Sequence, residues 1–137
     1  MGIDIRIEDE HGNLWDSADK STLSGSPDYL NWLLSSIDIS GTVCLRFIDR
    51  YGDTIFNRAQ AKELFDELAL VKTGISDEAI AIAVARNRKR LLKQGVRDSE
   101  PFWFPNEFEL NAFVERLRTL IQIAVQYPHG YIRFVGD

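Results

Sequence analysis

The sequence predicts a single α+β domain over residues 1–137, with a small mixed sheet of about four strands and about four helices packed mainly on one face. Short segments that alternate apolar and polar side chains have the period of a strand, and they lie at residues 3–8, 43–48 and 131–135. Longer segments repeat apolar residues every three or four positions behind a capping residue, and they begin at Asn57, Ser76 and Asn106.

The first third of the chain predicts a strand, a turn and a helix. Isoleucines alternate with charged residues over 3–8, and residues 9–13 are rich in turn formers, so residues 14–16 can return as a hairpin partner. Small polar residues over 17–25 indicate a surface loop. Ser26 then precedes Pro27, a pair typical of a helix start, and an apolar face follows as far as Ile37.

The central block, residues 42–71, joins a predicted buried strand to a well-marked helix. Val43, Leu45 and Phe47 alternate with Cys44 and Arg46, which predicts apolar groups on one side and Arg46 on the other. This alternation also places Cys44 on the arginine side, away from the core. A turn around Gly52 leads to a short strand over 54–56. Asn57 and Gln60 then form the pair of a reciprocal helix cap.

The last part of the chain predicts two more helices and a terminal strand. The helix after Ser76 ends in a run of bases before Gly95, and its segment 79–85 is uniformly apolar, which favours packing on two sides or a dimer contact. Residues 96–105 form a proline-bounded loop, and Asn106 with Glu109 repeats the capping pattern. Alternation over 131–136 predicts the last strand.

Composition predicts a cytoplasmic protein without a membrane span, cofactor or metal. The single cysteine excludes an internal disulfide and fits a reducing compartment, and the charged first ten residues lack a signal sequence. Residues 1–57 hold ten acids and four bases, a net charge of −6, whereas residues 58–137 carry +1. An acidic first half attracts basic proteins and repels nucleic acid.

Three arginines form the most distinctive candidate face. Arg6, Arg46 and Arg133 each lie between apolar residues of a predicted strand, so pairing of these strands would align them on the sheet face away from the helices. Such a face can bind a carboxylate or phosphate. The alternative is that cross-strand pairs with Asp4 and Glu8 simply keep an exposed face soluble, which is ordinary for sheets.

Carboxylates suggest a second candidate at one sheet edge. Asp49 and Asp137 each follow a predicted strand, with Asp53 nearby, so parallel strands would bring these hard oxygen ligands together for a divalent cation. Antiparallel strands would remove this possibility. The sequence holds no HExxH, DxDxDG, GxSxG or phosphate-binding glycine motif, which argues against an enzyme.

Phe102, Trp103 and Phe104 form a candidate partner loop. Three consecutive aromatic residues cannot all face a core, so at least one is expected near the surface or in a contact with another chain. The alternative is a loop folded over one end of the core. The basic run from Arg86 to Lys93 is attributed to the helix end rather than to nucleic-acid binding.

The run RFIDRYGDTIFNRAQ and the terminal YIRFVGD resemble small uncharacterised bacterial single-domain proteins, some of which look like immunity proteins. The resemblance implies no catalytic residue. Together with the acidic first half, it suggests a protein-binding module that neutralises a basic toxin or effector. Two alternatives stay open: a small-ligand-binding protein or enzyme that uses the arginine face or the carboxylate edge, and a self-associating protein such as a homodimer.

Overall fold

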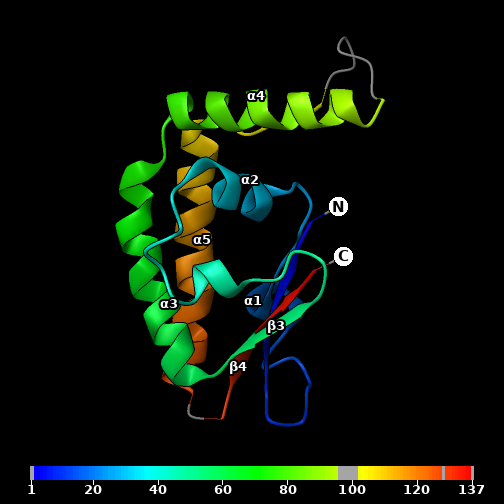
Figure 1. Cartoon of the computed structure of the whole chain (residues 1–137). Helices are drawn as coiled ribbons and strands as arrows, with labels where there is room; N and C mark the ends of the chain where they lie inside the picture. The colour runs from blue at the N-terminus through cyan, green and yellow to red at the C-terminus, as the bar shows by residue number, and fades with distance from the viewer. Residues whose placement is uncertain (1, 96–101, 128, 137) are drawn as a thin grey trace.

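A four-stranded antiparallel sheet with helices around it forms the α+β fold of this chain in the computed structural model (Figure 1). The structure describes residues 2–95, 102–127 and 129–136. The strand order is β2-β1-β4-β3. The strands are β1 (Asp4–Glu8), β2 (Thr22–Leu23), β3 (Asp53–Phe56) and β4 (Tyr131–Val135). The α+β prediction is confirmed, although every pairing is antiparallel where a mixed sheet was predicted.

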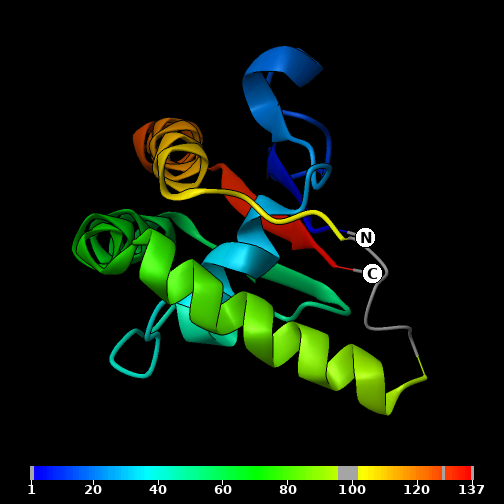
Figure 2. The same cartoon turned by 90° about the horizontal axis from the view of Figure 1, so that it is seen from above.

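The central strands β1 and β4 follow the predicted alternation. Arg6 lies opposite Arg133, and the neighbouring Ile5 lies opposite Phe134. Ile5 and Phe134 are buried on the helix side, because successive side chains of a strand point to opposite faces. Since the start of β1 pairs with the end of β4, the two ends of the chain come together at one end of the sheet (Figures 1 and 2).

The helices form one layer against the sheet and a second level across its end. Helices α3 (Arg58–Val71) and α5 (Glu107–Gln126) pack side by side along the sheet, and α4 (Asp77–Lys93) begins near the end of α3 and runs crosswise away from both (Figures 1 and 2). Helix α2 (Tyr29–Ser36) packs beneath α4, and the one-turn α1 (Ala18–Ser21) lies beside β1. None of the helices in the described ranges is long and apolar enough to cross a bilayer.

The predicted helix caps are present at three of the four helices that the sequence predicts. The side chains of Asn57 and Asn106 each accept from the backbone N–H three residues later, and Gln60 and Glu109 return the bond. Ser76 accepts from the N–H of Ala79 at 3.0 Å. Helix α2 differs from its prediction, because Pro27 lies in a turn before the helix and the carboxylate of Asp28 accepts from the Asn31 side chain instead of capping.

Two other stretches differ from the predictions in their local structure. Residues 17–25, predicted as a loop, include α1 and β2, while residues 14–16 contribute only a bridge between Leu14 and Glu8. Helix α4 does not pack on two sides, because Ile80 and Ala83 are buried whereas Ile82 is exposed.

The predicted strand over 43–48 was wrong, and a buried carboxylate explains why. The carboxylate of Glu67 on α3 accepts the backbone N–H groups of Val43, Cys44 and Leu45 at 2.7–3.1 Å. Those amides therefore have a side-chain acceptor in place of a neighbouring strand, and residues 45–47 form a 3₁₀ turn, η1 (Leu45–Phe47).

The side-chain directions in this segment differ from the prediction as well. Cys44, Leu45 and Ile48 are buried, whereas Val43 and Phe47 are exposed to solvent. A spacing of three to four replaces the expected spacing of two, because the backbone turns instead of extending. Cys44 therefore belongs to the core, contrary to the prediction, and Phe47 does not.

Candidate functional site: a cleft between two helices

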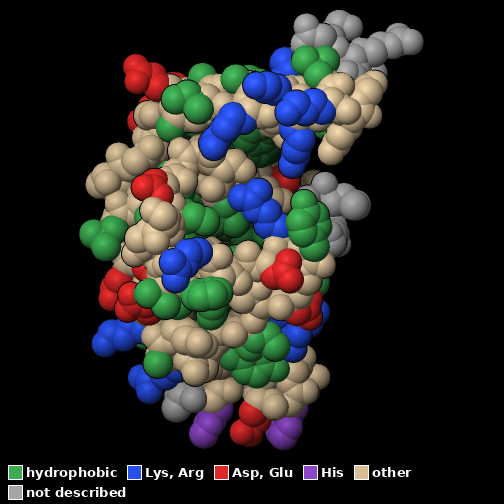
Figure 3. Space-filling view, viewed as in Figure 1, with side chains coloured by type: hydrophobic (Ala, Val, Ile, Leu, Met, Phe, Trp, Pro, Cys, Tyr) green, Lys and Arg blue, Asp and Glu red, His purple; other side chains and the backbone are tan. Residues whose placement is uncertain are grey.

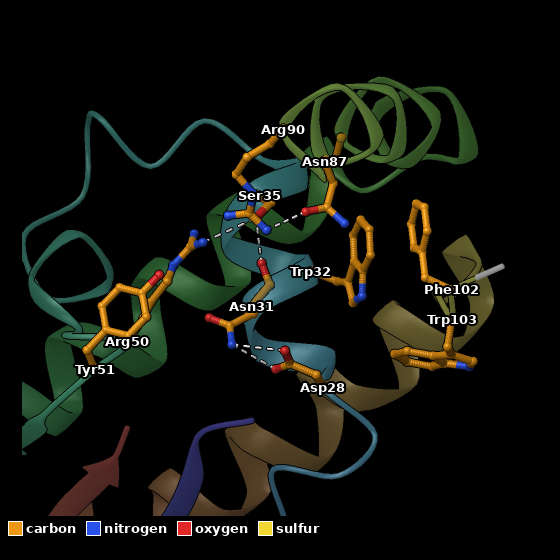
Figure 4. A pocket seen from close by; sticks show the side chains of 11 residues that line it. Asp28, Asn31, Trp32, Ser35, Arg50, Tyr51, Asn87, Arg90, Phe102 and Trp103 are labelled. Atoms are coloured by element: carbon orange, nitrogen blue, oxygen red, sulfur yellow. Dashed lines mark hydrogen bonds between the residues drawn. The ribbon is translucent and has the colours of Figure 1, made fainter. Parts of the chain in front are cut away.

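A cleft of about 440 Å³ opens between α2, α4, the turn after η1 and the segment that precedes α5 (Figure 4). We call it the α2–α4 cleft. Its lining residues are Asp28, Asn31, Trp32, Ser35, Arg50, Tyr51, Ala83, Asn87, Arg90, Phe102 and Trp103. Four separate stretches of the chain supply these residues, so the cleft exists only once the domain has folded.

Helical spacing explains how α2 and α4 present one face each to the cleft. Asp28, Asn31, Trp32 and Ser35 follow one another at intervals of three, one and three residues, which places them along one side of α2. On α4, Ala83, Asn87 and Arg90 have the same kind of spacing. The two helices pack against one another, so their polar faces meet at the cleft.

The turn that carries Arg50 is fixed against the end of the sheet. The carboxylate of Asp49 accepts from the N–H of Tyr51 at 2.9 Å, which closes the turn on itself. Gly136 donates its N–H to the carbonyl of Gly52 at 2.9 Å. A Cβ at Gly136 would lie 2.6 Å from the Arg50 carbonyl oxygen, so only glycine permits this approach.

Two arginines reach into the cleft from opposite walls. Arg50 donates to the Ser35 hydroxyl at 3.4 Å, a long bond, and Arg90 donates to the Asn87 amide oxygen at 2.5 Å. Figure 4 shows both side chains extending toward Ser35. Within the described ranges no carboxylate lies within ion-pair distance of either guanidinium. Both groups therefore retain donors for a further acceptor.

One polar atom of the cleft lacks a partner among the described residues. The side-chain nitrogen of Asn31 donates to both carboxylate oxygens of Asp28 at 3.0 Å. The amide oxygen of the same side chain is buried and accepts no hydrogen bond. In Figure 4 this oxygen points away from Asp28, toward the side of the cleft where Arg50 and Tyr51 lie. Since buried acceptors are normally satisfied, it marks a place for an N–H or O–H donor.

Aromatic rings border the cleft and reach the surface. The rings of Trp32 and Phe102 are nearly parallel, with centroids 6.2 Å apart, and the Arg88 guanidinium lies 4.8 Å from the Phe102 centroid. Tyr51 is 78% exposed, Trp103 44% and Phe104 46%. The predicted partner loop thus places Phe102 and Trp103 in the cleft lining, with Phe104 next to Trp32.

Helix α4 carries further basic side chains besides Arg90. Arg86 donates to the Ser35 carbonyl at 2.5 Å and so ties α4 to the end of α2. Lys89 and Lys93 are exposed on the same helix, and Figure 3 shows Lys and Arg side chains gathered over α4. The surface here is basic although the whole chain carries −5, so the α2–α4 cleft attracts anionic groups.

The predicted arginine face is only partly assembled and its charges are already paired. Arg6 and Arg133 are cross-strand neighbours, but Arg46 lies in η1, outside the sheet, because residues 43–48 do not form a strand. Arg133 donates to Glu8 and to Asp53, each at 2.8 Å. The Arg6 guanidinium lies 3.2 Å from Glu8.

The contacts on this face leave little capacity for a ligand. Hydrogen bonds from Arg133 to Glu8 and Asp53 raise the pKa of its guanidinium above the ordinary value. The buried carboxylate of Glu8 is shared by Arg6 and Arg133. Cross-strand ion pairing, the alternative open at the level of sequence, describes the contacts of Arg133 with Glu8 and Asp53, whereas Arg6 pairs with Glu8 of its own strand.

The carboxylate edge does not form in the predicted way. Its premise of two parallel strands was wrong, because β3 and β4 are antiparallel and no strand precedes Asp49. Asp49 accepts within its own turn and Asp53 pairs with Arg133, while Asp137 lies outside the described residues. In the part of the chain that the structure describes, no group of three metal-binding side chains comes together.

Cys44 does not have the surroundings of a nucleophile. The thiol is buried and lies 3.4 Å from the carbonyl oxygen of Gln60. Burial raises its pKa, and the negative charges of Glu67 and Glu63 raise it further, so the thiol stays protonated at neutral pH.

A second hollow of about 660 Å³ lies beside α5, between Trp15, Leu23, Ile123 and Tyr127. The rings of Trp15 and Tyr127 are 3.9 Å apart across its lining. One of its charged residues, Glu115, is already paired with Lys72 at 2.6 Å. The lining also holds the charged residues Asp16, Asp19, Lys20 and Arg116 beside its apolar side chains.

Sequence reasoning identified the aromatic segment but missed most of the cleft. Asn31, Arg50, Asn87 and Arg90 carry no motif, and they come from three separate segments of the chain that line one cleft only after α2 and α4 pack. A signal was nonetheless present, because polar residues at 28, 31 and 35 interrupt the apolar face expected of a short helix.

A scan of protein-family models, a search of curated proteins and a search of solved structures each found no match to this chain.

Proposed function

We propose that this chain is a protein-binding module that receives a segment of a partner protein in the α2–α4 cleft. The observation that carries the proposal is the exposed aromatic rim formed by Tyr51, Trp103 and Phe104 beside a concave, donor-rich surface. Exposed aromatic side chains next to a cleft are typical anchors of protein recognition, because they bury a large area at low entropic cost.

A peptide library displayed on phage tests this proposal without a known partner. The folded protein should enrich a peptide family, and the enriched peptide should shift the backbone amide resonances of α2, α4 and the Arg50–Tyr51 turn. The W103A and Y51A variants should bind the peptide at least about tenfold more weakly, as expected for aromatic anchors. Enrichment that is equal for wild type and both variants, or shifts confined to other surfaces, would count against the proposal.

A matched control separates the cleft from general surface stickiness. Phe108 is 80% exposed and lies on the first turn of α5, outside the lining of the cleft. Like W103A and Y51A, the F108A variant removes an exposed aromatic ring, but it should leave peptide affinity within about twofold of wild type. An equal loss in F108A would mean that exposed rings bind peptides wherever they lie.

An immunity-type role is a separate form of protein binding, in which the partner would occupy a surface other than the α2–α4 cleft. It is supported by the resemblance of the central block to immunity-like proteins and by the acidic first 57 residues. A basic toxin would be attracted to the acidic side chains of that half that lie outside the α2–α4 cleft, because the surroundings of the cleft are basic. If a neighbouring gene encodes a toxic protein, co-expression of this chain should restore growth; continued toxicity would remove this form.

A small-ligand-binding protein is the second candidate function. Its ligand would bind in the α2–α4 cleft rather than at the arginine face or the carboxylate edge, the two surfaces that the sequence suggested. A volume of about 440 Å³ lies within the range of small-molecule sites. Direct titration with nucleotides and aromatic carboxylates tests this candidate. Saturable binding of such a compound, combined with failure of the peptide selection, would replace the protein-binding proposal.

A further inference from the structure

The polar groups of the α2–α4 cleft indicate which chemical group a bound partner carries, in addition to the aromatic anchors at the rim. Arg50 and Arg90 enter from opposite walls, and neither has a carboxylate within ion-pair distance among the described residues. The contrast with the sheet face is clear, because Arg133 there holds two carboxylates at 2.8 Å. Unpaired guanidiniums that face a common space are suited to an oxyanion from outside the chain.

The single acid in the lining does not neutralise this pair of arginines. The carboxylate of Asp28 accepts two hydrogen bonds from the side-chain nitrogen of Asn31, each at 3.0 Å, and it is one negative charge beside two guanidiniums. Arg86, which donates to the Ser35 carbonyl, adds positive charge beside the cleft. The field in the cleft therefore favours a negatively charged group.

The unpaired oxygen of Asn31 requires that a ligand also carry a hydrogen-bond donor. It is buried, accepts no hydrogen bond in the described part of the chain, and points into the cleft (Figure 4). A ligand that satisfies it must bring an N–H or O–H donor within about 3 Å. A peptide backbone carries such a donor at almost every residue, so a chain segment can offer a carboxylate and an N–H together.

The apolar surface beside the cleft continues past the cleft into a second, neighbouring hollow. Phe104 lies 6.1 Å from Phe102 between ring centroids, and it also lines a neighbouring hollow of about 470 Å³ with Ile80, Val84 and Pro105. A compact ligand in the α2–α4 cleft would not reach this second hollow. An extended segment would cover both, with apolar side chains on the rings.

We propose that the α2–α4 cleft binds an acidic segment of a partner protein, with a carboxylate between Arg50 and Arg90 and a backbone N–H on the Asn31 amide oxygen. This inference rests on the proposed function and adds the chemistry of the partner. Aromatic or aliphatic residues that flank the carboxylate pack on Trp103 and Phe104.

Titration with matched peptides, followed by nuclear magnetic resonance at low salt, tests the inference. The probe is a nine-residue peptide with a central Asp-Glu pair flanked by leucine and tryptophan, acetylated and amidated at its ends. Its control carries Asn-Gln in place of Asp-Glu. The acidic peptide should bind at least about tenfold more tightly, should shift the side-chain signals of Arg50, Arg90 and Asn31, and should weaken as salt is added.

Charge-matched variants separate the cleft from the basic helix as a whole. R50Q and R90Q should each weaken the acidic peptide about tenfold, whereas K89Q, which removes the same charge from the exposed side of α4, should change the affinity by less than about twofold. Amide spectra of each variant establish that it is folded. Equal losses in R90Q and K89Q would overturn the inference, because only the general field of α4 would then be at work.

The remaining outcomes distinguish this inference from the proposed function. If the neutral peptide binds the same cleft as tightly as the acidic one, the acidic preference is wrong while peptide binding stands. If neither peptide binds and ATP or a short oligothymidylate shifts the cleft resonances instead, both proposals are wrong. Binding of the acidic peptide in preference to ATP and to the oligothymidylate supports the inference.

Discussion

At the scale of single residues, Glu67 determines the local structure of a segment that lies more than twenty residues away. Its buried carboxylate accepts three successive backbone N–H groups, so it acts as the cap of η1 from another helix. Alternation of Val43, Leu45 and Phe47 gives no sign of this, because the deciding contact is not local. Such a buried acceptor strengthens the fold only while all of its donors are in place.

Replacement of Glu67 should therefore be costly. E67L leaves three amides without their acceptor and should lower the free energy of unfolding by about 2–4 kcal/mol, while E67Q, which keeps one oxygen, should lose less. Urea denaturation measures both values. E63L on the exposed side of α3 is the control and should change the free energy by no more than about 0.5 kcal/mol. Equal effects at the two positions would contradict the capping role.

Cys44 gives a prediction on pH. Its pKa in the folded chain is raised by burial and by the charges of Glu67 and Glu63, so the unfolded chain releases the thiol proton first. Stability from this group is therefore complete below the unfolded pKa of about 9 and is lost as pH rises through the folded pKa. Wild type should lose more unfolding free energy than C44A between pH 8 and pH 10. Parallel pH curves for the two proteins would show that the thiol contributes nothing.

At the scale of elements, helix caps and strand alternation were reliable guides. The reciprocal caps of α3 and α5 and the alternation of β1 and β4 depend on neighbouring residues, and all four elements lie where the sequence places them. Residues 43–48 differ from prediction because a tertiary contact of Glu67 decides their structure, whereas α2 differs because the carboxylate of Asp28 accepts from the nearby Asn31 side chain. The α2–α4 cleft was missed because Arg50 and Asn87 line one space only after distant segments of the chain have packed.

The cap of α3 gives a measurable test at this scale. N57A removes the acceptor for the Gln60 N–H, so the free energy of unfolding should fall by about 1 kcal/mol. N57S keeps a side-chain oxygen at the same position and should recover most of that loss. Thermal and urea denaturation give both values, and an equal loss in the two variants would point to a cause other than capping.

At the scale of the whole molecule, the arginines divide into two groups with different tasks. Arg6 and Arg133 share the buried Glu8 on the outer sheet face, and Arg133 links β4 to Glu8 of β1 and Asp53 of β3. Arg50 and Arg90 line the α2–α4 cleft without an acidic partner in the described part of the chain. The net charge of −5 hides this division, because it averages an ion-paired face with a basic cleft.

This division predicts that replacing an arginine by glutamine lowers stability at one site and peptide affinity at the other. R133Q leaves Glu8 with fewer donors and should lower the free energy of unfolding by about 1–3 kcal/mol, with the affinity for acidic peptide unchanged. R50Q should change the unfolding free energy by no more than about 0.5 kcal/mol while it weakens the peptide. Denaturation and titration of both variants check the pair of effects. Loss of stability in R50Q as large as that in R133Q would place Arg50 among the structural residues.

The origin of the cleft walls in four distant stretches has a practical consequence. A ligand of the cleft binds only the folded chain, because the unfolded chain has no cleft. Binding therefore raises the melting temperature by an amount that depends on the ligand concentration relative to Kd. At a hundredfold excess over Kd this linkage is worth about 2.7 kcal/mol. Heat resistance alone can therefore serve as a screen for what this protein takes up, before any partner has been identified.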